Sequence, residues 1–287
     1  MAEARKLDTS HYDLSEKDFN RLSQFIYQEC GIKMPPAKKT MLEARLQKRI
    51  KSLGIHSFRD YCDYLFSRQG IEQELVHMID MVTTNKTDFF REPAHFEYMV
   101  QNVLPELAVK LKSHHRKLMI WSAGCSTGEE PYTMSMVLSH FAEQTPGFDF
   151  LILATDISTR VLDKAKMAVY EEEKVIPVPI EMKRKYLLRS KDRSSRLVRV
   201  VPQLREKIRF RRLNFMNNDF GFREQMDIIF CRNVIIYFDR ATQEKLLRKF
   251  CRHLNPNGLV FMGHSETLSG LDVPLEMIHP TIYRKLQ

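Results

Sequence analysis

Cysteine is scarce in this chain, and no two cysteines have the C-x-x-C spacing of a zinc or redox site. The five cysteines are Cys30, Cys62, Cys125, Cys231 and Cys251. An odd number without such spacing predicts neither a disulfide framework nor a metal site. We therefore expect reduced thiols, most of them buried as small apolar side chains, and no bound metal.

Long apolar runs are also missing, and none approaches the roughly 20 residues of a membrane span. The first residues, Met1–Asp8, are charged and contain no apolar signal region. We therefore expect a cytoplasmic protein without membrane insertion. Internal repeats and low-complexity tracts are absent as well.

Size and positive charge are what the chain does have. Its 287 residues, 43% of them hydrophobic, are enough for one large domain and a small one. The 45 Lys and Arg residues exceed the 36 Asp and Glu residues, giving a formal net charge of +9. This excess indicates an acidic partner, but its sign does not distinguish nucleic acid, a membrane surface and an acidic protein.

The first eighty or so residues have the pattern of a small helical domain. Ser15, with Asp18 three residues later, is typical of a helix start, and Gly31 of a helix end. Further helices are expected over 37–53, from Ser57 and over 72–81. Within 37–53 an apolar stripe lies beside a free basic face. The stripe consists of Leu42, Leu46, Ile50 and Leu53, and the basic face of Lys38, Arg45, Lys48 and Arg49.

Residues 83–94 interrupt the helical pattern and form the expected junction between residues 1–82 and 95–287. They are not a flexible Gly/Ser linker, because hydrogen-bonding side chains are mixed with Phe89 and Phe90. Such a segment is suited to packing against a neighbouring surface.

An apolar run over 118–123, a glycine-bearing turn and a helix start at Glu129 form a strand–loop–helix unit. A second apolar run over 150–155 ends at Asp156, an acid placed to accept hydrogen bonds from ribose hydroxyls. Gly124 and Gly128 allow close approach of a ligand but do not form the dinucleotide motif G-x-G-x-x-G. Glu129 and the following Glu130 would repel a phosphate and suit a cationic ligand such as S-adenosylmethionine.

Beyond this unit helices and strands alternate, as in a doubly wound α/β domain. We expect a strand over 226–231, a helix over 241–253, a turn over 255–258, a strand over 259–262 and a closing strand over 280–285. Two short basic strands, 197–200 and 207–211, indicate an antiparallel insertion of about residues 187–212.

With these segments in place, the sequence resembles the glutamate methyltransferases of chemotaxis receptors, the CheR-type enzymes. The resemblance spans nearly the whole chain and rests on four stretches in order: Thr84–Glu92, Trp121–Tyr132, Phe230–Phe238 and Gly263–Glu266. It implies a Rossmann-like S-adenosylmethionine-dependent methyltransferase domain with a small antiparallel β-subdomain and an all-helical amino-terminal domain.

The resemblance also implies roles for individual residues. Asn85, Thr87 and Arg91 contact the cofactor region, Glu129 faces the amino-acid part of the cofactor, and Asp156 binds its ribose beside the turn at Gly124. Asn214, Phe215, Arg232 and Asn233 line the adenosine pocket. Tyr237 lies near the transferring methyl group. The basic face of the helical domain meets the cytoplasmic helical bundle of a receptor, and the β-subdomain is a possible site for a receptor carboxyl-terminal peptide, although its connection, 189–196, contains no glycine.

The implied reaction moves a methyl group to a glutamate carboxylate, giving a methyl ester and S-adenosylhomocysteine. A glutamate with a pKa of about 4.3 is already ionised at neutral pH, so no general base is needed. Arg91 is the candidate for orienting the carboxylate, because a guanidinium can hold one oxygen while the other attacks. Tyr237 is expected to shape the site with it.

Structural roles compete with several of these assignments. Asp156 or Ser158 could cap the next helix, and Glu129 with Glu130 could complement its dipole. Asn85 and Thr87 could satisfy loop backbone groups, and Tyr237 could be core.

Two other functions are alternatives. A nucleic-acid methyltransferase fits the charge, but the chain lacks the Asp/Asn-Pro-Pro-aromatic motif and any Pro-Cys pair, so no nucleic-acid partner is expected. A non-catalytic S-adenosylmethionine-binding regulator would be expected to lose pocket residues, which are present here.

Overall fold

The computed structural model describes residues 13–286, so the charged segment Met1–Asp8 lies outside the described residues. The chain divides into two compact units, Met1–Thr84 and Asn85–Gln287. The division falls inside the expected junction, and the junction residues from Asn85 onward belong to the second unit. Among residues 13–286, no helix has both the length and the apolar character needed to cross a membrane.

The first unit is helical, as expected. Its elements are α1 (Glu16–Cys30), the 3-10 turn η2 (Pro36–Lys38), α2 (Lys39–Ser52), α3 (Phe58–Leu65), α4 (Arg68–Gln73) and α5 (Leu75–Val82). Ser15 caps α1 by accepting a hydrogen bond from the Asp18 amide, and Gly31 ends it in the left-handed conformation. The prediction of one helix over 72–81 is wrong in one respect, because Glu74 separates two short helices, α4 and α5.

The second unit contains a seven-stranded sheet with the order β6-β2-β1-β7-β8-β10-β9. The strands are β1 (Leu118–Ala123), β2 (Phe150–Asp156), β6 (Ile208–Arg212), β7 (Met226–Cys231), β8 (Leu254–Met262), β9 (Leu275–His279) and β10 (Ile282–Lys285). The first five in spatial order are parallel, and β10 and β9 are antiparallel additions. Their buried apolar runs explain why β1, β2 and β7 were readable from the sequence.

Helices connect these strands. They are α6 (Pro93–Tyr98), the π-helix η3 (Met99–Val103), α7 (Leu104–Ser113), α8 (Glu129–Gln144), α9 (Thr159–Met167), α10 (Ile180–Tyr186), α11 (Pro202–Arg205), the 3-10 turn η5 (Ile235–Tyr237) and α12 (Arg240–His253). The core of this unit is built from apolar residues of the strands and of α8, including Ile120, Leu138, Ile152 and Phe230.

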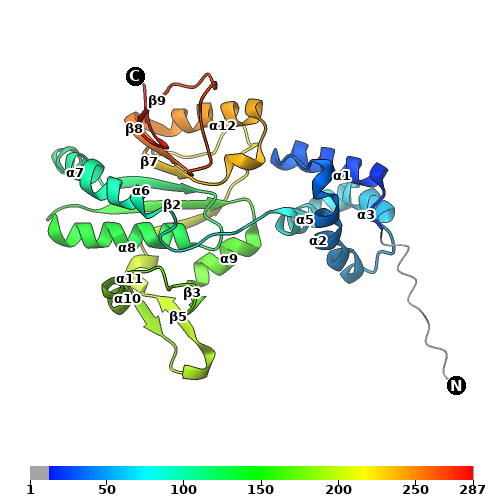
Figure 1. Ribbon diagram of the computed structural model, residues 1–287, viewed down its shortest axis with the longest axis horizontal. Coiled ribbons are helices and arrows are strands. Elements are labelled where there is room, and N and C mark those ends of the chain that lie inside the picture. Colours follow the sequence, from blue (N-terminus) through cyan, green and yellow to red (C-terminus); the bar gives the residue numbers. More distant parts are fainter. Residues whose placement is uncertain (1–12, 287) are drawn as a thin grey trace. The chain divides into compact units, whose positions relative to one another are not determined.

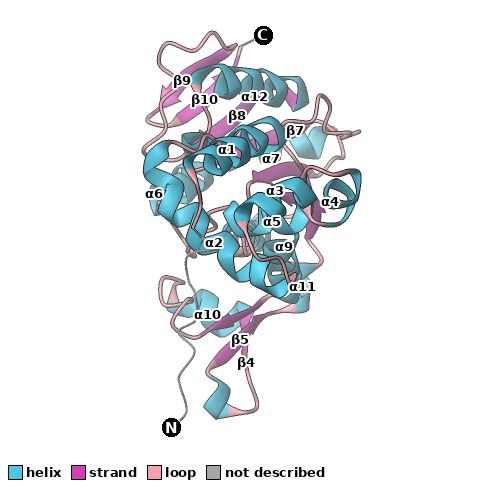
Figure 2. Cartoon of the chain, turned by 90° about the vertical axis from the view of Figure 1, so that its right-hand side faces the viewer, coloured by secondary structure: helices cyan, strands magenta, loops and turns pink. Residues whose placement is uncertain are grey.

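The inserted antiparallel sheet differs from its expected boundaries. Its strands are β3 (Val169–Glu171), β4 (Leu187–Arg189) and β5 (Leu197–Val200), in the order β3-β5-β4, and the 3-10 turn η4 (Arg193–Ser195) joins β4 to β5. Figure 1 shows β3 and β5 beside α10 and α11, and Figure 2 shows β4 next to β5. The expected limits of 187–212 are wrong at both ends, because β3 precedes them and the basic strand β6 pairs in parallel with β2.

Two features near the carboxyl end also differ from expectation. The turn expected over 255–258 is a bulge inside β8, where the register with β7 shifts between Met226 and Ile228 and Asn257 has a φ of 61°. Strand β9 has no fully buried residue and carries too little apolar signal to be recognised from the sequence.

Candidate cofactor site at the carboxyl ends of the strands

Four adjacent parallel strands, β6, β2, β1 and β7, end at one edge of the large sheet. Most of the expected site residues lie at this edge: Gly124 after β1, Asp156 at the end of β2, Asn214 and Phe215 after β6, and Arg232 and Asn233 after β7. The carboxyl-terminal edge of an α/β sheet is where such folds bind ligands. The fold therefore brings together residues that are up to 109 positions apart, as between Gly124 and Asn233.

The turn after β1 depends on two glycines. Gly124 and Gly128 have φ values of 88° and 98°, which favour glycine. A Cβ on Gly124 would lie 2.6 Å from Val234 Cγ2, and one on Gly128 would lie 2.8 Å from the Tyr170 hydroxyl. The turn thus packs closely on the loop after β7 and on β3, with no room for a larger residue.

Asp156 is buried and its carboxylate is fixed in direction. The Ser126 amide donates to Oδ2 over 2.9 Å and the Ser158 amide to Oδ1 over 3.0 Å. Each carboxylate oxygen can accept a further hydrogen bond. The Ser158 hydroxyl caps α9 by accepting from the Val161 amide, so the capping role belongs to Ser158.

Glu129 and Glu130 begin α8 and are both buried, but their surroundings differ. Glu129 Oε2 accepts from the Thr127 hydroxyl over 2.6 Å, and burial raises the pKa of its carboxyl group. Glu130 accepts from the Ser122 hydroxyl over 2.7 Å and from Arg232 Nε over 2.8 Å. Both carboxylate oxygens of Glu130 are therefore engaged within the protein, whereas the Thr127 hydroxyl binds Glu129 through Oε2.

The segment before α6 is bonded to the turn after β1 and to α8. The Ser126 hydroxyl donates to the Asn85 carbonyl over 2.9 Å, and the Phe90 amide donates to Thr133 Oγ1 over 3.1 Å. Thr87 and Arg91 are half-buried in this segment, and Arg91 Nη1 donates to the Lys86 carbonyl over 3.2 Å. Asn85 is thus bonded to the loop that contains Gly124, and Thr87 and Arg91 follow it in the same segment.

The loop after β7 is held by a residue whose role the sequence did not reveal. The buried carboxylate of Glu266 accepts hydrogen bonds of 2.7–2.9 Å from the amides of Gly263, Asn233, Val234 and Ile235. Burial raises the pKa of Glu266 although these four amides oppose the shift. Its only sequence signal was its place in the stretch Gly263–Glu266.

Asn233 and Tyr237 belong to this loop. Asn233 has a φ of 59°, and its buried Oδ1 has no hydrogen-bond partner in the described part of the chain. An unpaired buried acceptor is costly and indicates a missing donor. Tyr237 ends η5 and is half-buried, so it is not a fully buried core residue.

The segment after β6 is fixed by its aromatic residue. Phe215 is buried against Trp121, Phe220 and Phe250, with ring centroids 5.8–6.2 Å apart. Asn214 Oδ1 accepts from the Met216 amide over 2.9 Å, and Lys249 donates to the Phe215 carbonyl. This places both predicted residues beside the end of β2, with the ring of Phe215 in an aromatic cluster.

Arg232 differs most from its expected role. Its side chain is only 2% exposed, and its guanidinium contacts Glu130, Glu92 and the Arg91 carbonyl. It is therefore turned into the protein and presents no exposed surface to an adenosine ring. The family resemblance assigned Arg232 to the pocket together with its neighbour Asn233, which is half-buried.

The basic face of the helical unit is not free, contrary to expectation. Arg49 forms a bidentate ion pair with the buried carboxylate of Glu74, with a shortest distance of 2.6 Å. Arg45 donates to the carbonyls of Val82 and Thr83 and to the Thr84 hydroxyl, so it ends α5. Lys48 is exposed and Lys38 is half-buried. Arg45 and Arg49 thus have structural partners within the helical unit.

The residues present fit S-adenosylmethionine. The carboxylate of Asp156, fixed in direction, lies at the end of β2, and a turn with two glycines follows β1. The buried carboxylate of Glu129 begins α8, where it would repel a phosphate and suits a cation. Asn233 has an unpaired buried acceptor among the described residues. Such a site defines the S-adenosylmethionine-dependent methyltransferases.

The chain belongs to the CheR methyltransferase family. The family model of the CheR methyltransferase SAM-binding domain matches residues 85–284, and that of its all-alpha domain matches residues 17–83. The protein is therefore an S-adenosylmethionine-dependent methyltransferase of the chemotaxis type.

Relatives match over nearly the full chain. The chemotaxis protein methyltransferase of Borreliella burgdorferi is 38% identical over 275 residues, which cover 95% of each chain. That of Escherichia coli is 38% identical and covers 96% of this chain and 93% of its own. Chemotaxis protein methyltransferase 2 of Pseudomonas aeruginosa is 37% identical, covering 95% and 94%.

Proposed function

We propose that the protein transfers a methyl group from S-adenosylmethionine to glutamate side chains of chemotaxis receptors, forming glutamyl methyl esters. The observation that carries the proposal is the position of Arg91, a half-buried cation in a segment bonded to both the turn after β1 and α8. A cation there suits an anionic acceptor. The names of the relatives support a role in chemotaxis.

The cofactor supplies a methyl group on a sulfonium, and this chain supplies its binding site. We assign the ribose to Asp156, whose carboxylate is already fixed by two amides. Glu129 faces the α-ammonium group, and Asn85 and Thr87 contact the same end beside Gly124. Asn214, Phe215 and Asn233 line the adenosine pocket.

Arg91 orients the acceptor carboxylate, and Tyr237 shapes the space near the reacting methyl group. No side chain has to remove a proton, because the carboxylate is ionised at neutral pH. The contribution of the protein is alignment of the attacking oxygen, which is worth on the order of 7–11 kcal/mol when near ideal. Arg91 must hold one oxygen only, since bonding both would weaken the nucleophile.

Residues 1–82 act as the receptor-docking domain in this proposal, and residues 83–94 join it to the methyltransferase domain, 95–287. Lys48 is the basic residue best placed to meet an acidic receptor bundle, because it is exposed. Lys38 adds to the same basic surface. Arg45 and Arg49 contribute charge from positions fixed by their internal partners.

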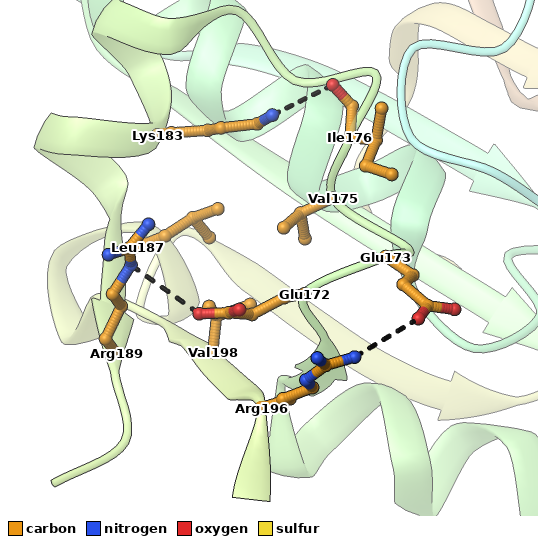
Figure 3. A pocket seen from close by; sticks show the side chains of 9 residues that line it. All are labelled: Glu172, Glu173, Val175, Ile176, Lys183, Leu187, Arg189, Arg196 and Val198. Atoms are coloured by element: carbon orange, nitrogen blue, oxygen red, sulfur yellow. Dashed lines mark hydrogen bonds and ion pairs between the residues drawn. The ribbon is translucent and has the colours of Figure 1, made fainter. Parts of the chain in front are cut away.

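The small sheet provides a possible site for a receptor carboxyl-terminal peptide. Strand β4 is an edge strand, which can pair with an added strand. Beside it lies a cavity of about 390 Å³ with Val175, Leu187 and Val198 among its lining residues. Figure 3 shows the ion pairs Glu172–Arg189 and Glu173–Arg196 at this cavity. An apolar side chain could enter it while a terminal carboxylate meets the arginines.

The test is methyl transfer from labelled S-adenosylmethionine to receptor cytoplasmic domains, compared with RNA and DNA at the same salt concentration. We expect base-labile label on receptor glutamates, located by mass spectrometry. Label in nucleic acid alone would reject the proposal in favour of a nucleic-acid methyltransferase. Cofactor binding without any transfer would favour a regulatory protein.

A further inference from the structure

Arg232 lies in a buried network between the loop after β7 and the start of α8. Its Nε is 2.8 Å from Glu130 Oε2, and its guanidinium lies over the rings of Phe96 and Phe230, 5.2 and 5.5 Å from their centroids. Both members of the ion pair are nearly inaccessible, with side-chain exposures of 2% and 11%. Such a pair has one geometry, because planar guanidinium stacking and a short hydrogen bond both constrain it.

The other end of the same guanidinium reaches the segment that carries Arg91. Arg232 Nη1 donates to the Arg91 carbonyl over 2.7 Å and lies 3.5 Å from Glu92 Oε2. It is also 3.3 Å from His95 Nδ1. Burial lowers the pKa of His95 to about 4, so its ring is neutral at pH 7 and can accept this hydrogen bond. One side chain therefore joins α8 to the backbone of Arg91.

The backbone on both sides of Arg91 is in an unfavourable conformation. Phe90 and Glu92 have φ values of 52° and 54°, in the left-handed region that non-glycine residues seldom adopt. Such residues persist only where their surroundings hold them. The Phe90 amide is held by Thr133, Glu92 by the His264 amide over 3.2 Å, and the carbonyl between them by Arg232.

We infer that Arg232 is a positioning residue for methyl transfer, which fixes the backbone at Arg91 and thereby the direction of the Arg91 side chain. This positioning role replaces the contact with the adenosine of the cofactor that the family resemblance implied for Arg232. The inference rests on the proposed role of Arg91 in orienting the acceptor carboxylate. Arg232 touches neither acceptor nor cofactor in this assignment, and its effect passes through Arg91.

Two variants test the inference. Arg232→Met combined with Glu130→Gln removes both members of the shorter ion pair, so that the Glu130 carboxylate is not left buried without its cation. Arg232→Lys keeps a cation beside Glu130, but one ammonium group cannot reproduce the fork that also reaches the Arg91 carbonyl. Both are measured by calorimetric binding of S-adenosylhomocysteine and by steady-state methylation of the receptor domain, in the full-length protein.

We expect kcat to fall by a factor of 10 to 100 in both variants, while the Kd for S-adenosylhomocysteine stays within threefold. A weakening of S-adenosylhomocysteine binding by tenfold or more, with kcat kept at saturating cofactor, would make Arg232 a cofactor ligand and overturn the inference. The matched control is Arg116→Met with Asp227→Asn. This double variant removes another bidentate arginine–carboxylate pair, which lies at the amino ends of β1 and β7, away from the cofactor site. It is expected to leave kcat unchanged.

A double-mutant cycle separates action through Arg91 from a general structural effect. The double variant Arg91→Ala with Arg232→Lys is compared with Arg91→Ala alone. Its kcat should be lower by less than threefold, because the two changes remove the same function. Multiplicative losses would overturn the inference and leave the proposed role of Arg91 intact. Unchanged turnover in Arg91→Ala alone would reject both.

Discussion

Arg49 binds Glu74 through both carboxylate oxygens, at 2.6 Å for the shortest contact, where the Glu74 side chain is 1% exposed. The Tyr61 hydroxyl donates to the same carboxylate over 3.1 Å. The pair links α2 to the break between α4 and α5. Arg49 therefore has a structural role in the helical unit, whatever its contribution to receptor docking.

The first prediction concerns the stability of this unit. Arg49→Met leaves the buried Glu74 carboxylate without its cation, and breaking such a pair costs about 3–5 kcal/mol. We expect the free energy of unfolding of the helical unit to fall by this order, as measured by denaturant unfolding followed by circular dichroism. Lys48→Met, on the same helix but exposed, is the control and should unfold like the parent.

The second prediction concerns docking. Lys48→Glu should weaken receptor binding and reduce its dependence on salt, because it removes an exposed charge that an acidic bundle would attract. Turnover with saturating receptor should be retained. Binding by titration calorimetry at two salt concentrations measures this, and an unchanged affinity at low salt would remove Lys48 from the docking surface.

The third prediction concerns Asp156. Asp156→Asn keeps an acceptor for one of the two amides but loses the charge-assisted hydrogen bonds proposed for the ribose, worth about 1.5–3 kcal/mol. Affinity for S-adenosylhomocysteine should therefore fall roughly 10- to 100-fold in calorimetry. Asp163→Asn, an exposed acid on α9 paired with Lys166, is the control. Equal affinities in both variants would contradict the ribose role.

The fourth prediction is a pH dependence. Burial raises the pKa of Glu129 above its ordinary 4.5. As the pH falls toward this raised pKa, the carboxylate takes up a proton and loses its attraction for the ligand ammonium group. We expect the affinity for S-adenosylhomocysteine to weaken as the pH falls, and the weakening to begin at a higher pH than an unperturbed glutamate would give. The Glu129→Gln variant should bind S-adenosylhomocysteine weakly at every pH, so that its affinity changes less with pH. If the affinities of the variant and the parent change with pH in parallel, Glu129 does not bind the ammonium group.

The fifth prediction concerns the turn after β1. Gly128→Ala forces a Cβ to within 2.8 Å of the Tyr170 hydroxyl at a φ of 98°. Such strain costs on the order of 1–3 kcal/mol, so both thermal stability and cofactor affinity should fall. Gly147→Ala also has a positive φ, but its added Cβ meets no atom within 4 Å, which makes it the control for strain without crowding. A larger loss in Gly147→Ala would contradict the packing argument.

The parallel strands and the helical domain were predictable because their signals are local. The apolar runs of β1, β2 and β7 are largely buried and continuous in the sequence, and Ser15, Ser57 and Gly31 mark helix ends. The small sheet was assigned wrongly because β5 and β6 are both short and basic. Only pairing distinguishes them, since β6 pairs with β2 and β5 pairs with β3 and β4.

The sequence by itself determined which residue types follow each strand. These residues predicted a cationic nucleoside cofactor and carried the family resemblance. Only the tertiary structure decided what each side chain touches. Arg232 and Asn233 are neighbours in sequence, yet one is turned into a buried network and the other lies in a loop held by Glu266. The reason is physical: burial and long-range partners such as Glu130 and Glu266 set side-chain direction, and neither is encoded in local spacing.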